Sequence, residues 1–406
     1  MTINKSSNIL FLIPFALWCL VPYFSFDLIA RFAVLLSLLS FIVIAFYGGF
    51  IESNEKKISY YLAIVFVLLV YINFTNFIFS SSEFTLRHLH FSMFLLVSGF
   101  CSLYINVSSN KYSKIVVVTI LASNIITALI TLKGLYLDHN IARLLSKSND
   151  VSVHLAKQGY GGYGYIYANL VIFPILCLFS KLNYDFNRST TIVGGLVNFN
   201  IILCVLLLTK AQYSIALVCL IVVIVYLSYK ILGGYVSVLI ILILFLIFLV
   251  LPVASFISIE SIGDILEGTR YKAKFLDVMS AFDGAAKVDG DVTSRATAYI
   301  KSVTIFFENP ILGSLSFDNN IGRHSDILDK FAQWGGVIGV LVTYLIIALP
   351  LKIEKMIPDK YRYFIVCFVF CLLWTAMFNT MPMEAAVAII LLVSIVNIYK
   401  KEFINV

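Results

Sequence analysis

The sequence predicts an all-α, polytopic membrane protein, and three observations carry this prediction. Of the 406 residues 61% are hydrophobic and only 13% are charged, whereas soluble proteins average about 50% and about 25%. Apolar runs of the length that a helix needs to cross a bilayer, about 20 residues, recur along the chain. The basic residues alternate between loops as they do in oriented membrane proteins. Because no segment of domain length is polar, we expect one membrane domain over residues 1–406.

Twelve apolar runs reach a spanning length. The first is expected to stay as an uncleaved span, because no small-residue cleavage site follows it. The seventh and eighth are separated only by Thr209–Gln212, and either of them could instead be re-entrant. The predicted spans are 8–24, 29–51, 58–80, 88–107, 115–136, 163–180, 190–209, 212–229, 235–254, 335–351, 362–380 and 383–399.

The distribution of lysine and arginine predicts the orientation of these spans. With the N-terminus inside, fourteen basic residues fall in cytoplasmic segments, while the short outer loops hold only Arg31, Arg87 and Lys210. Cytoplasmic loops carry such an excess of positive charge. Both termini are therefore predicted to be cytoplasmic, and two long loops, 137–162 and 255–334, are predicted to face outward and to contain short amphipathic helices.

Several function classes are disfavoured by the composition. All seven cysteines lie in apolar segments, which argues against structural disulfides and against a metal cluster, and no set of His, Cys and carboxylate residues has metal-ligand spacing. The net charge of +7 is accounted for by the orientation signals, so nucleic acid is not implied as a partner. We therefore expect no metal and no cofactor.

The polar stretch 293–339 predicts two helix starts that face one irregular loop. Thr293 or Ser294 can cap the first helix, and Pro310 is expected to end it. Ser325 with Asp326 can open the second helix, which runs into a membrane-length segment. Arg295 lies close to the first helix start, where unpaired N–H groups favour an anion. An anion-binding site at Arg295 is the resulting hypothesis.

Each candidate residue also has a plainer interpretation. Arg295 could form a surface ion pair with Asp291 or Glu308 instead of holding a phosphate. His324 could be a general base, or a loop residue bonded to nearby backbone. Asp326 could assist His324 or act as a first-turn acid, and Asp329 could pair with Lys330 or a neighbouring loop. Basic side chains near the outer membrane–water boundary commonly contact lipid headgroups. This plainer interpretation applies to Arg270, Arg323, Lys272 and Lys274.

Lys210 differs from these surface cations. It lies in a tight turn between two apolar spans, where a charge is costly and indicates a partner or an anionic ligand. The first long loop adds Arg143, Lys147, His154 and Lys157, and ends in a Gly-Gly-Tyr-Gly-Tyr run. No Gly-Lys-Ser/Thr follows that run, so it does not predict a phosphate loop.

Within the polar stretch the chain resembles the membrane O-antigen polymerase and O-antigen ligase superfamily. An arginine precedes an aromatic and aliphatic helix, followed by Asn-Pro-x-x-Gly, then Gly-x-His-Ser/Asn-x-x-Leu and Gly-x-x-Gly. This motif covers about a tenth of the chain, and elsewhere only the layout of spans and late large loop is similar. The matching positions are Arg295, Asn309, Pro310, Gly313, Gly322, His324, Ser325, Leu328, Gly336 and Gly339.

The resemblance implies a metal-independent glycosyltransferase of the bacterial inner membrane. It would transfer a growing glycan from undecaprenyl diphosphate to a sugar hydroxyl of another lipid-linked repeat unit at the periplasmic face. The run beginning with His324 is more similar to polymerases, while ligases more often have His-Asn there and Ser-Arg where this chain has Thr209-Lys210. A ligase would use lipid A–core as the acceptor. The implied partners are the lipid-linked oligosaccharide, membrane lipid and a chain-length regulator, without nucleic acid.

The resemblance also implies roles for the candidate residues. Arg295 would clamp the diphosphate, with Arg270, Lys210 and Arg323 as secondary candidates, and His324 would be the base. Asp326 and Arg143 are candidates for support. A flippase is the alternative from another class, but it predicts paired halves and charges at the membrane midplane. This chain concentrates its polarity in two outward loops instead, which favours chemistry at one face.

Overall fold

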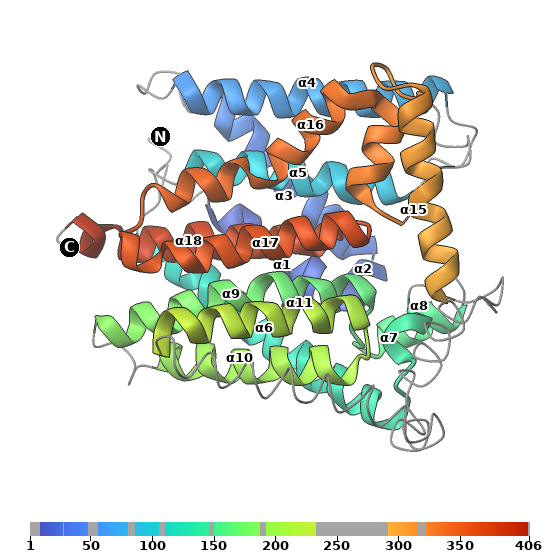
Figure 1. Cartoon of the computed structure of the whole chain (residues 1–406). Coiled ribbons are helices and arrows are strands. Elements are labelled where there is room, and N and C mark those ends of the chain that lie inside the picture. The colour runs from blue at the N-terminus through green and yellow to red at the C-terminus, as the bar shows by residue number, and fades with distance from the viewer. Residues whose placement is uncertain are drawn as a thin grey trace. The chain divides into compact units, whose positions relative to one another are not determined.

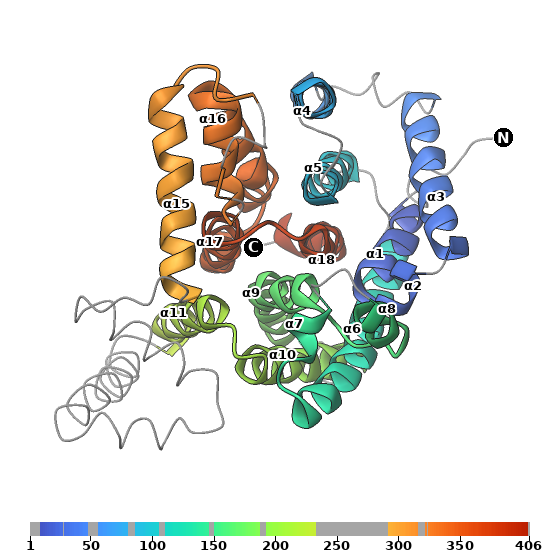
Figure 2. The same cartoon turned by 90° about the vertical axis from the view of Figure 1, so that its right-hand side faces the viewer.

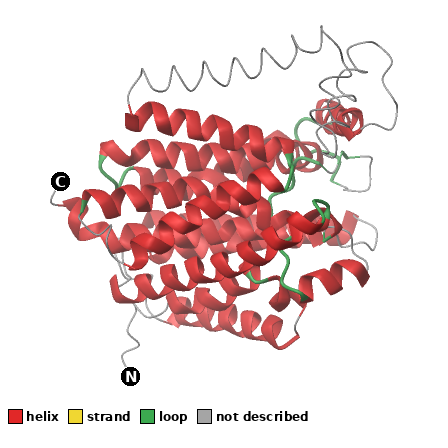
Figure 3. Cartoon of the chain, turned by 90° about the horizontal axis from the view of Figure 1, so that it is seen from below, coloured by secondary structure: helices red, strands yellow, loops and turns green. Residues whose placement is uncertain are grey.

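The computed structural model describes residues 9–26, 28–47, 56–79, 86–104, 110–145, 150–186, 192–232, 291–315, 321–322 and 324–404. Every regular element in these ranges is helical and none is a strand (Figure 3), which confirms the all-α prediction for this part of the chain. The helices before residue 233 are α1 (Leu12–Leu20), α2 (Pro22–Phe26), α3 (Leu28–Tyr47), α4 (Lys56–Phe79), α5 (Leu86–Tyr104), α6 (Asn110–Leu137), α7 (Ile141–Leu144), α8 (Asp150–Lys157), α9 (Tyr163–Asp185), α10 (Ile192–Lys210) and α11 (Ser214–Leu232) (Figure 1). Those that follow are α15 (Asp291–Glu308), α16 (Asp326–Glu354), α17 (Arg362–Phe378) and α18 (Ala386–Ile404), with short 3₁₀ turns η2 (Asp359–Tyr361) and η3 (Met383–Ala385).

Seven helical stretches among the described residues are long and apolar enough to cross a membrane. They are α6, α9, α10, α11 and α16, together with Asp359–Phe378 and Met383–Lys400. Each falls on a predicted span. The predicted spans 29–51, 58–80 and 88–107 coincide with helices α3, α4 and α5, and the first predicted span is divided between α1 and α2. The run 235–254 lies outside the described residues. The fold is therefore that of a helical membrane protein.

The chain falls into two compact units. The larger unit contains residues 1–211, 341–376 and 381–406, and the smaller contains residues 212–340 and 377–380. In the larger unit α18 is the central helix, because every side chain from Ala385 to Tyr399 is buried. It packs against α5, α6 and α9 (Figure 2), and α10 packs against α6 and α9.

A buried amide cluster joins three helices of the larger unit. The side chain of Asn124 on α6 donates to the Oδ1 atoms of Asn169 on α9 and Asn200 on α10, at 3.0 and 2.9 Å. The hydroxyl of Tyr165 donates to Asn124 Oδ1 at 2.9 Å, and the Asn169 amide donates to the Tyr165 carbonyl. All four side chains are buried. Polar side chains that hydrogen-bond across helices stabilise membrane bundles, so this cluster fixes the register of α6, α9 and α10.

We expect Asn124→Ala to lower the free energy of unfolding by about 2 kcal/mol, because it removes three bonds and leaves buried acceptors unsatisfied. The matched control is Ile126→Ala on the same helix, whose side chain is 58% exposed. Thermal unfolding of the detergent-solubilised protein measures both. Equal midpoints for the two variants would contradict the assigned role of the cluster.

In the smaller unit α15 and α16 form a hairpin, and α16 is broken inside it. Gly335 has φ 72° and ψ −177°, which is not helical. The Ala332 carbonyl accepts the N–H of Ser314, and the Gln333 carbonyl accepts the N–H of Leu315, in place of N–H groups one helical turn further along α16. The N–H of Gly336 donates to the Pro310 carbonyl. The loop after α15 thus replaces hydrogen bonds that the helix lacks at the break. As expected, α15 ends just before Asn309 and Pro310.

Candidate functional site

The first helix of the predicted site begins earlier than the sequence indicates. Helix α15 starts at Asp291, so the prediction that Thr293 or Ser294 caps it is wrong. Apolar periodicity marks only the later turns, whereas an acid in the first turn extends the helix backwards. Arg295 is consequently the fifth helical residue and does not lie at the helix terminus. The helix dipole therefore does not support an anion site at Arg295. Support for the site comes from side-chain contacts instead.

Arg295 connects α15 to the turn that follows α17. Its side chain is half-buried, and Nη1 donates to Asn379 Oδ1 at 3.3 Å. The backbone carbonyl of Asn379 in turn accepts the N–H of Asp326 at 3.2 Å. One residue, Asn379, therefore joins the guanidinium of α15 to the first residue of α16. One turn along α15, the hydroxyl of Tyr299 donates to the Phe378 carbonyl at 2.8 Å, which fixes the same turn a second time.

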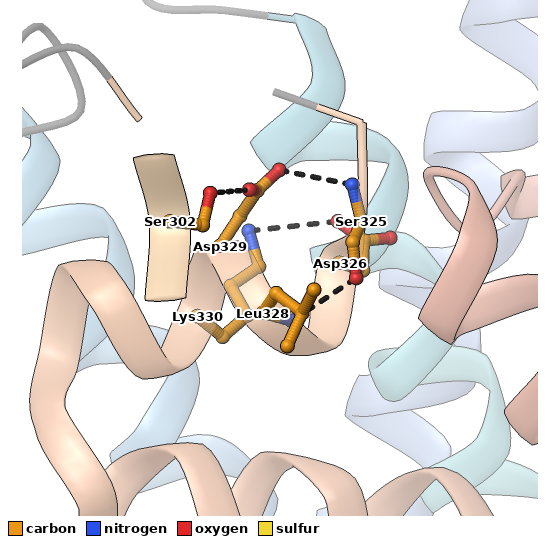
Figure 4. Close-up of polar contacts among 6 residues, drawn as sticks. All are labelled: Ser302, Ser325, Asp326, Leu328, Asp329 and Lys330. Atoms are coloured by element: carbon orange, nitrogen blue, oxygen red, sulfur yellow. Dashed lines mark hydrogen bonds and ion pairs between the residues drawn. The ribbon is translucent and has the colours of Figure 1, made fainter. Parts of the chain in front are cut away.

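A second set of contacts joins α15 to the segment before α16 (Figure 4). Ser302 Oγ donates to Asp329 Oδ1 at 2.7 Å, and Asp329 Oδ2 accepts the N–H of Ser325 at 3.2 Å. Ser325 Oγ accepts the N–H of Leu328 at 3.1 Å, so Ser325 is the N-cap of α16, as expected. The N–H of Gly322 donates to Ser302 Oγ at 3.0 Å. Ser302, Ser325 and Asp329 are buried.

These contacts place His324 on a short bridge with both ends fixed. Gly322 and Ser325 flank the bridge, and both are tied to α15 through Ser302 and Asp329. A Cβ atom at Gly322 would lie 2.0 Å from the Ala298 carbonyl, so the backbone passes directly over α15 within one turn of Arg295. The His324 side chain itself is exposed. The structure thus brings the Arg295 helix and the His324 segment together, although residues 309–325 separate the two helices along the chain.

Two acids lie in the first turn of α16, as one alternative for Asp326 predicted. Asp326 Oδ1 lies 3.8 Å from Lys330 Nζ, and Lys330 Nζ also lies 4.9 Å from the centroid of the Trp334 ring. Asp329, by contrast, accepts the hydroxyl of Ser302. The contact of Asp329 with a neighbouring loop, one of its two sequence-based alternatives, is confirmed by the N–H of Ser325. Asp326, Asp329 and Lys330 are all buried, so their charges are held in place.

A shallow groove of about 490 Å³ runs along the exposed side of α15. Hydroxyl, amide, ammonium and carboxylate groups alternate along it with two isoleucines. Such a surface offers both donors and acceptors to a polar ligand. The groove is lined by Thr297, Ile300, Lys301, Thr304, Ile305, Glu308, Asn309 and Ser314.

Of the remaining predicted site residues, the structure describes Lys210 and Arg143. Lys210 and Arg143 belong to the other compact unit. Lys210 ends α10 with an exposed side chain whose Nζ lies 4.7 Å from the centroid of the Tyr136 ring. That cation–π contact supplies the partner that a charge in a tight turn requires. Arg143 is half-buried on α7. Arg270 and Arg323 lie outside the described residues.

Sequence reasoning missed Ser302 and Asn379, and it did not pair Lys330 with Asp326. Ser302 had a usable signal, because it lies seven residues from Arg295 and so shares its helix face. Asn379 had none, since its contact with Arg295 joins residues 84 apart. Lys330 follows Asp326 at the spacing of a helical pair, but its burial against Trp334 could not be read from that spacing.

Comparison with known proteins assigns no family to the chain: no family model, curated protein or solved structure matches it. Within the described ranges, no three His, Cys, Asp or Glu side chains gather in a group that could hold a metal ion.

We expect Asp329→Ala to destabilise the protein by about 3 kcal/mol, because it removes two hydrogen bonds to a buried carboxylate, each worth about 1.5–3 kcal/mol. Asp329→Asn should cost less, since its amide oxygen can still accept the Ser325 N–H. Glu308→Ala, an exposed acid on the same hairpin, is the control. Thermal unfolding in detergent distinguishes these variants. An unfolding temperature of Asp329→Ala equal to that of Glu308→Ala would refute the role of Asp329 in fixing the His324 bridge.

Proposed function

We propose that the protein is a lipid-linked oligosaccharide glycosyltransferase of the bacterial inner membrane, and specifically an O-antigen polymerase. The observation that carries this proposal is the fixed placement of the Arg295 helix against the His324 bridge, which agrees with the motif resemblance. In support, the described residues form a helical membrane protein with seven candidate spans. The proposal includes twelve spans, cytoplasmic termini and two outward-facing loops, 137–162 and 255–334.

In the proposed reaction a sugar hydroxyl of one lipid-linked repeat unit attacks the anomeric carbon of the glycan on undecaprenyl diphosphate. The bond between that carbon and the diphosphate oxygen breaks as the new glycosidic bond forms. His324 takes the proton of the attacking hydroxyl, a role that suits an exposed imidazole near neutral pH. Arg295 holds the departing diphosphate, for which a guanidinium is suited because it binds phosphate bidentately.

The contacts of the site suggest how these two groups are kept in position. Asn379 orients the guanidinium of Arg295, and Ser302 with Asp329 fixes the ends of the His324 bridge. Asp326 acts by positioning α16, since its carboxylate faces Lys330 and its N–H binds Asn379. Arg270, Lys210 and Arg323 remain proposed as secondary phosphate contacts, and Arg143 as support.

Surface polysaccharide profiling on a gel tests the function. A strain that lacks this gene should show lipid A–core bearing a single repeat unit, and the wild-type gene should restore the ladder. His324→Ala at a matched membrane level should not restore it. Bare core with long polymer accumulating on undecaprenyl diphosphate would instead identify a ligase. Bare core without lipid-linked polymer outside the membrane would indicate a flippase and would overturn the site assignment.

A further inference from the structure

Helix α15 has three distinct faces. One face packs against the protein and carries Arg295, Ala298, Tyr299 and Ser302, which are buried or half-buried. A second face is exposed and polar, with Thr297, Lys301, Thr304 and Glu308 spaced by three and four residues, and it borders the groove. The third face is exposed yet apolar. Helices with a single buried stripe have a polar remainder, so the third face requires an explanation.

The apolar stripe consists of Ile300, Val303, Phe307, Ile311 and Leu312, which are 37–72% exposed. The first three lie on α15 at helical spacing, and the last two lie in the loop that follows. The structure thus buries the neighbouring face of α15 and leaves this stripe exposed. A contiguous exposed apolar surface rimmed by polar residues marks an interaction site.

The stripe continues onto a candidate membrane span. Backbone hydrogen bonds fix the loop to the break in α16. The N–H groups of Ser314 and Leu315 donate to the carbonyls of Ala332 and Gln333, and the N–H of Gly336 donates to the carbonyl of Pro310. Immediately beyond the break, Val337 and Val340 of α16 are 71% and 60% exposed. The segment 331–351 around and beyond the break contains no charged residue. The loop is therefore attached to α16 inside the charge-free part of a candidate membrane span.

The backbone of this hairpin also suits the membrane boundary. Irregular backbone is tolerated at membrane depth only where its polar groups are paired within the protein. Here the N–H groups of Gly313, Ser314 and Leu315 all donate to backbone carbonyls, at 2.8–2.9 Å. The glycines at 313 and 335 make this pairing possible, because a Cβ atom at either would lie within 2.4 Å of the opposing backbone.

We propose that the apolar stripe of α15 and its loop is inserted into the acyl region of the bilayer, so that α15 lies at the boundary between protein, lipid and water. Amphipathic helices bind membrane interfaces in this way, with the apolar face in lipid. The groove on the polar face would then open to water. A ligand with a polar head and a long apolar tail would meet both environments along this one helix. The inference is independent of the proposed glycosyl transfer.

Fluorescence quenching in reconstituted vesicles tests the proposal. Cysteine is introduced into the full chain at Phe307 or Leu312 in the stripe, and at Lys301 or Thr304 on the polar face as matched controls. Each variant is labelled in detergent with an environment-sensitive maleimide and reconstituted into phosphatidylcholine vesicles. Wild type, whose seven cysteines are free and mostly buried, gives the background labelling. Val303→Cys replaces either stripe variant if that variant does not elute as a single species.

Lipid with brominated acyl chains should quench most of the fluorescence at Phe307 and Leu312 and little at Lys301 and Thr304. Aqueous iodide should give the opposite pattern. Quenching of all four positions by iodide alone would overturn the proposal, because the stripe would then face water. Protection of the stripe from both quenchers, increasing with the protein-to-lipid ratio, would also overturn it, since a second copy of the chain would be the partner.

Discussion

Gly335→Ala is expected to abolish the folded α15–α16 hairpin. The backbone at Gly335 has φ +72° and ψ −177°, a combination that is essentially restricted to glycine and costs other residues about 1–3 kcal/mol. The new methyl carbon would also lie 2.0 Å from the Ile311 carbonyl oxygen and 2.8 Å from the Leu312 nitrogen. Both obstacles are backbone atoms, so no side-chain rotation relieves the clash. We expect a total loss of several kcal/mol, close to the whole stability of a typical domain.

The measurement is the yield of monodisperse protein after detergent extraction, followed by the unfolding temperature of whatever remains. Gly195→Ala on α10 is the matched control, because a Cβ atom there meets nothing within 4 Å. That control should be neutral or slightly stabilising, since alanine is the better helix former by about 1 kcal/mol. Gly335→Asn should fail like Gly335→Ala. A Gly335→Ala protein that extracts and unfolds like wild type would show that α16 is not broken at this residue.

The broken helix shows how far the sequence could lead. Hydrophobic runs predicted where the helices lie, since membrane burial requires long apolar segments wherever they occur. The predicted span 335–351 even begins at the break, because charge and polarity end just before it. The sequence pattern could not show that α16 continues on both sides of Gly335. The helix continues past the break because the backbone of the loop 309–315 replaces the missing helical hydrogen bonds.

The site shows the same division between local and distant contacts. Pro310 as a helix stop and Ser325 as a helix cap depend on neighbours within one turn, and both predictions are confirmed. The partner of Arg295 depends on a residue at the end of another helix, Asn379. A single sequence carries no signal for that pairing. The burial of the α15 face that carries Arg295 and Ser302, rather than of its apolar stripe, likewise depends on what surrounds the helix.

Arg295→Ala is expected to reduce glycan polymerisation by ~10²-fold or more, the effect of removing one preorganised electrostatic donor from an active site. Arg295→Lys should recover little of the rate, because an ammonium keeps the charge but loses the planar fork that binds a diphosphate bidentately. The measurement is the rate of chain growth by purified protein on lipid-linked repeat units. Lys355→Ala, an exposed cation after α16, should leave the rate unchanged.

A structural role for Arg295 gives a different pattern, which Asn379→Ala reveals. If Arg295 serves only to hold Asn379, then Arg295→Ala and Asn379→Ala should lower the unfolding temperature equally, and activity should follow the amount of folded protein. If Arg295 binds the donor diphosphate, Arg295→Ala should retain a near-wild-type unfolding temperature while losing the reaction. Asn379→Ala should then keep part of the rate, because the guanidinium remains present but is less well oriented. A folded Arg295→Ala protein that polymerises at the wild-type rate would remove Arg295 from the mechanism, and with it the observation on which the proposed function rests.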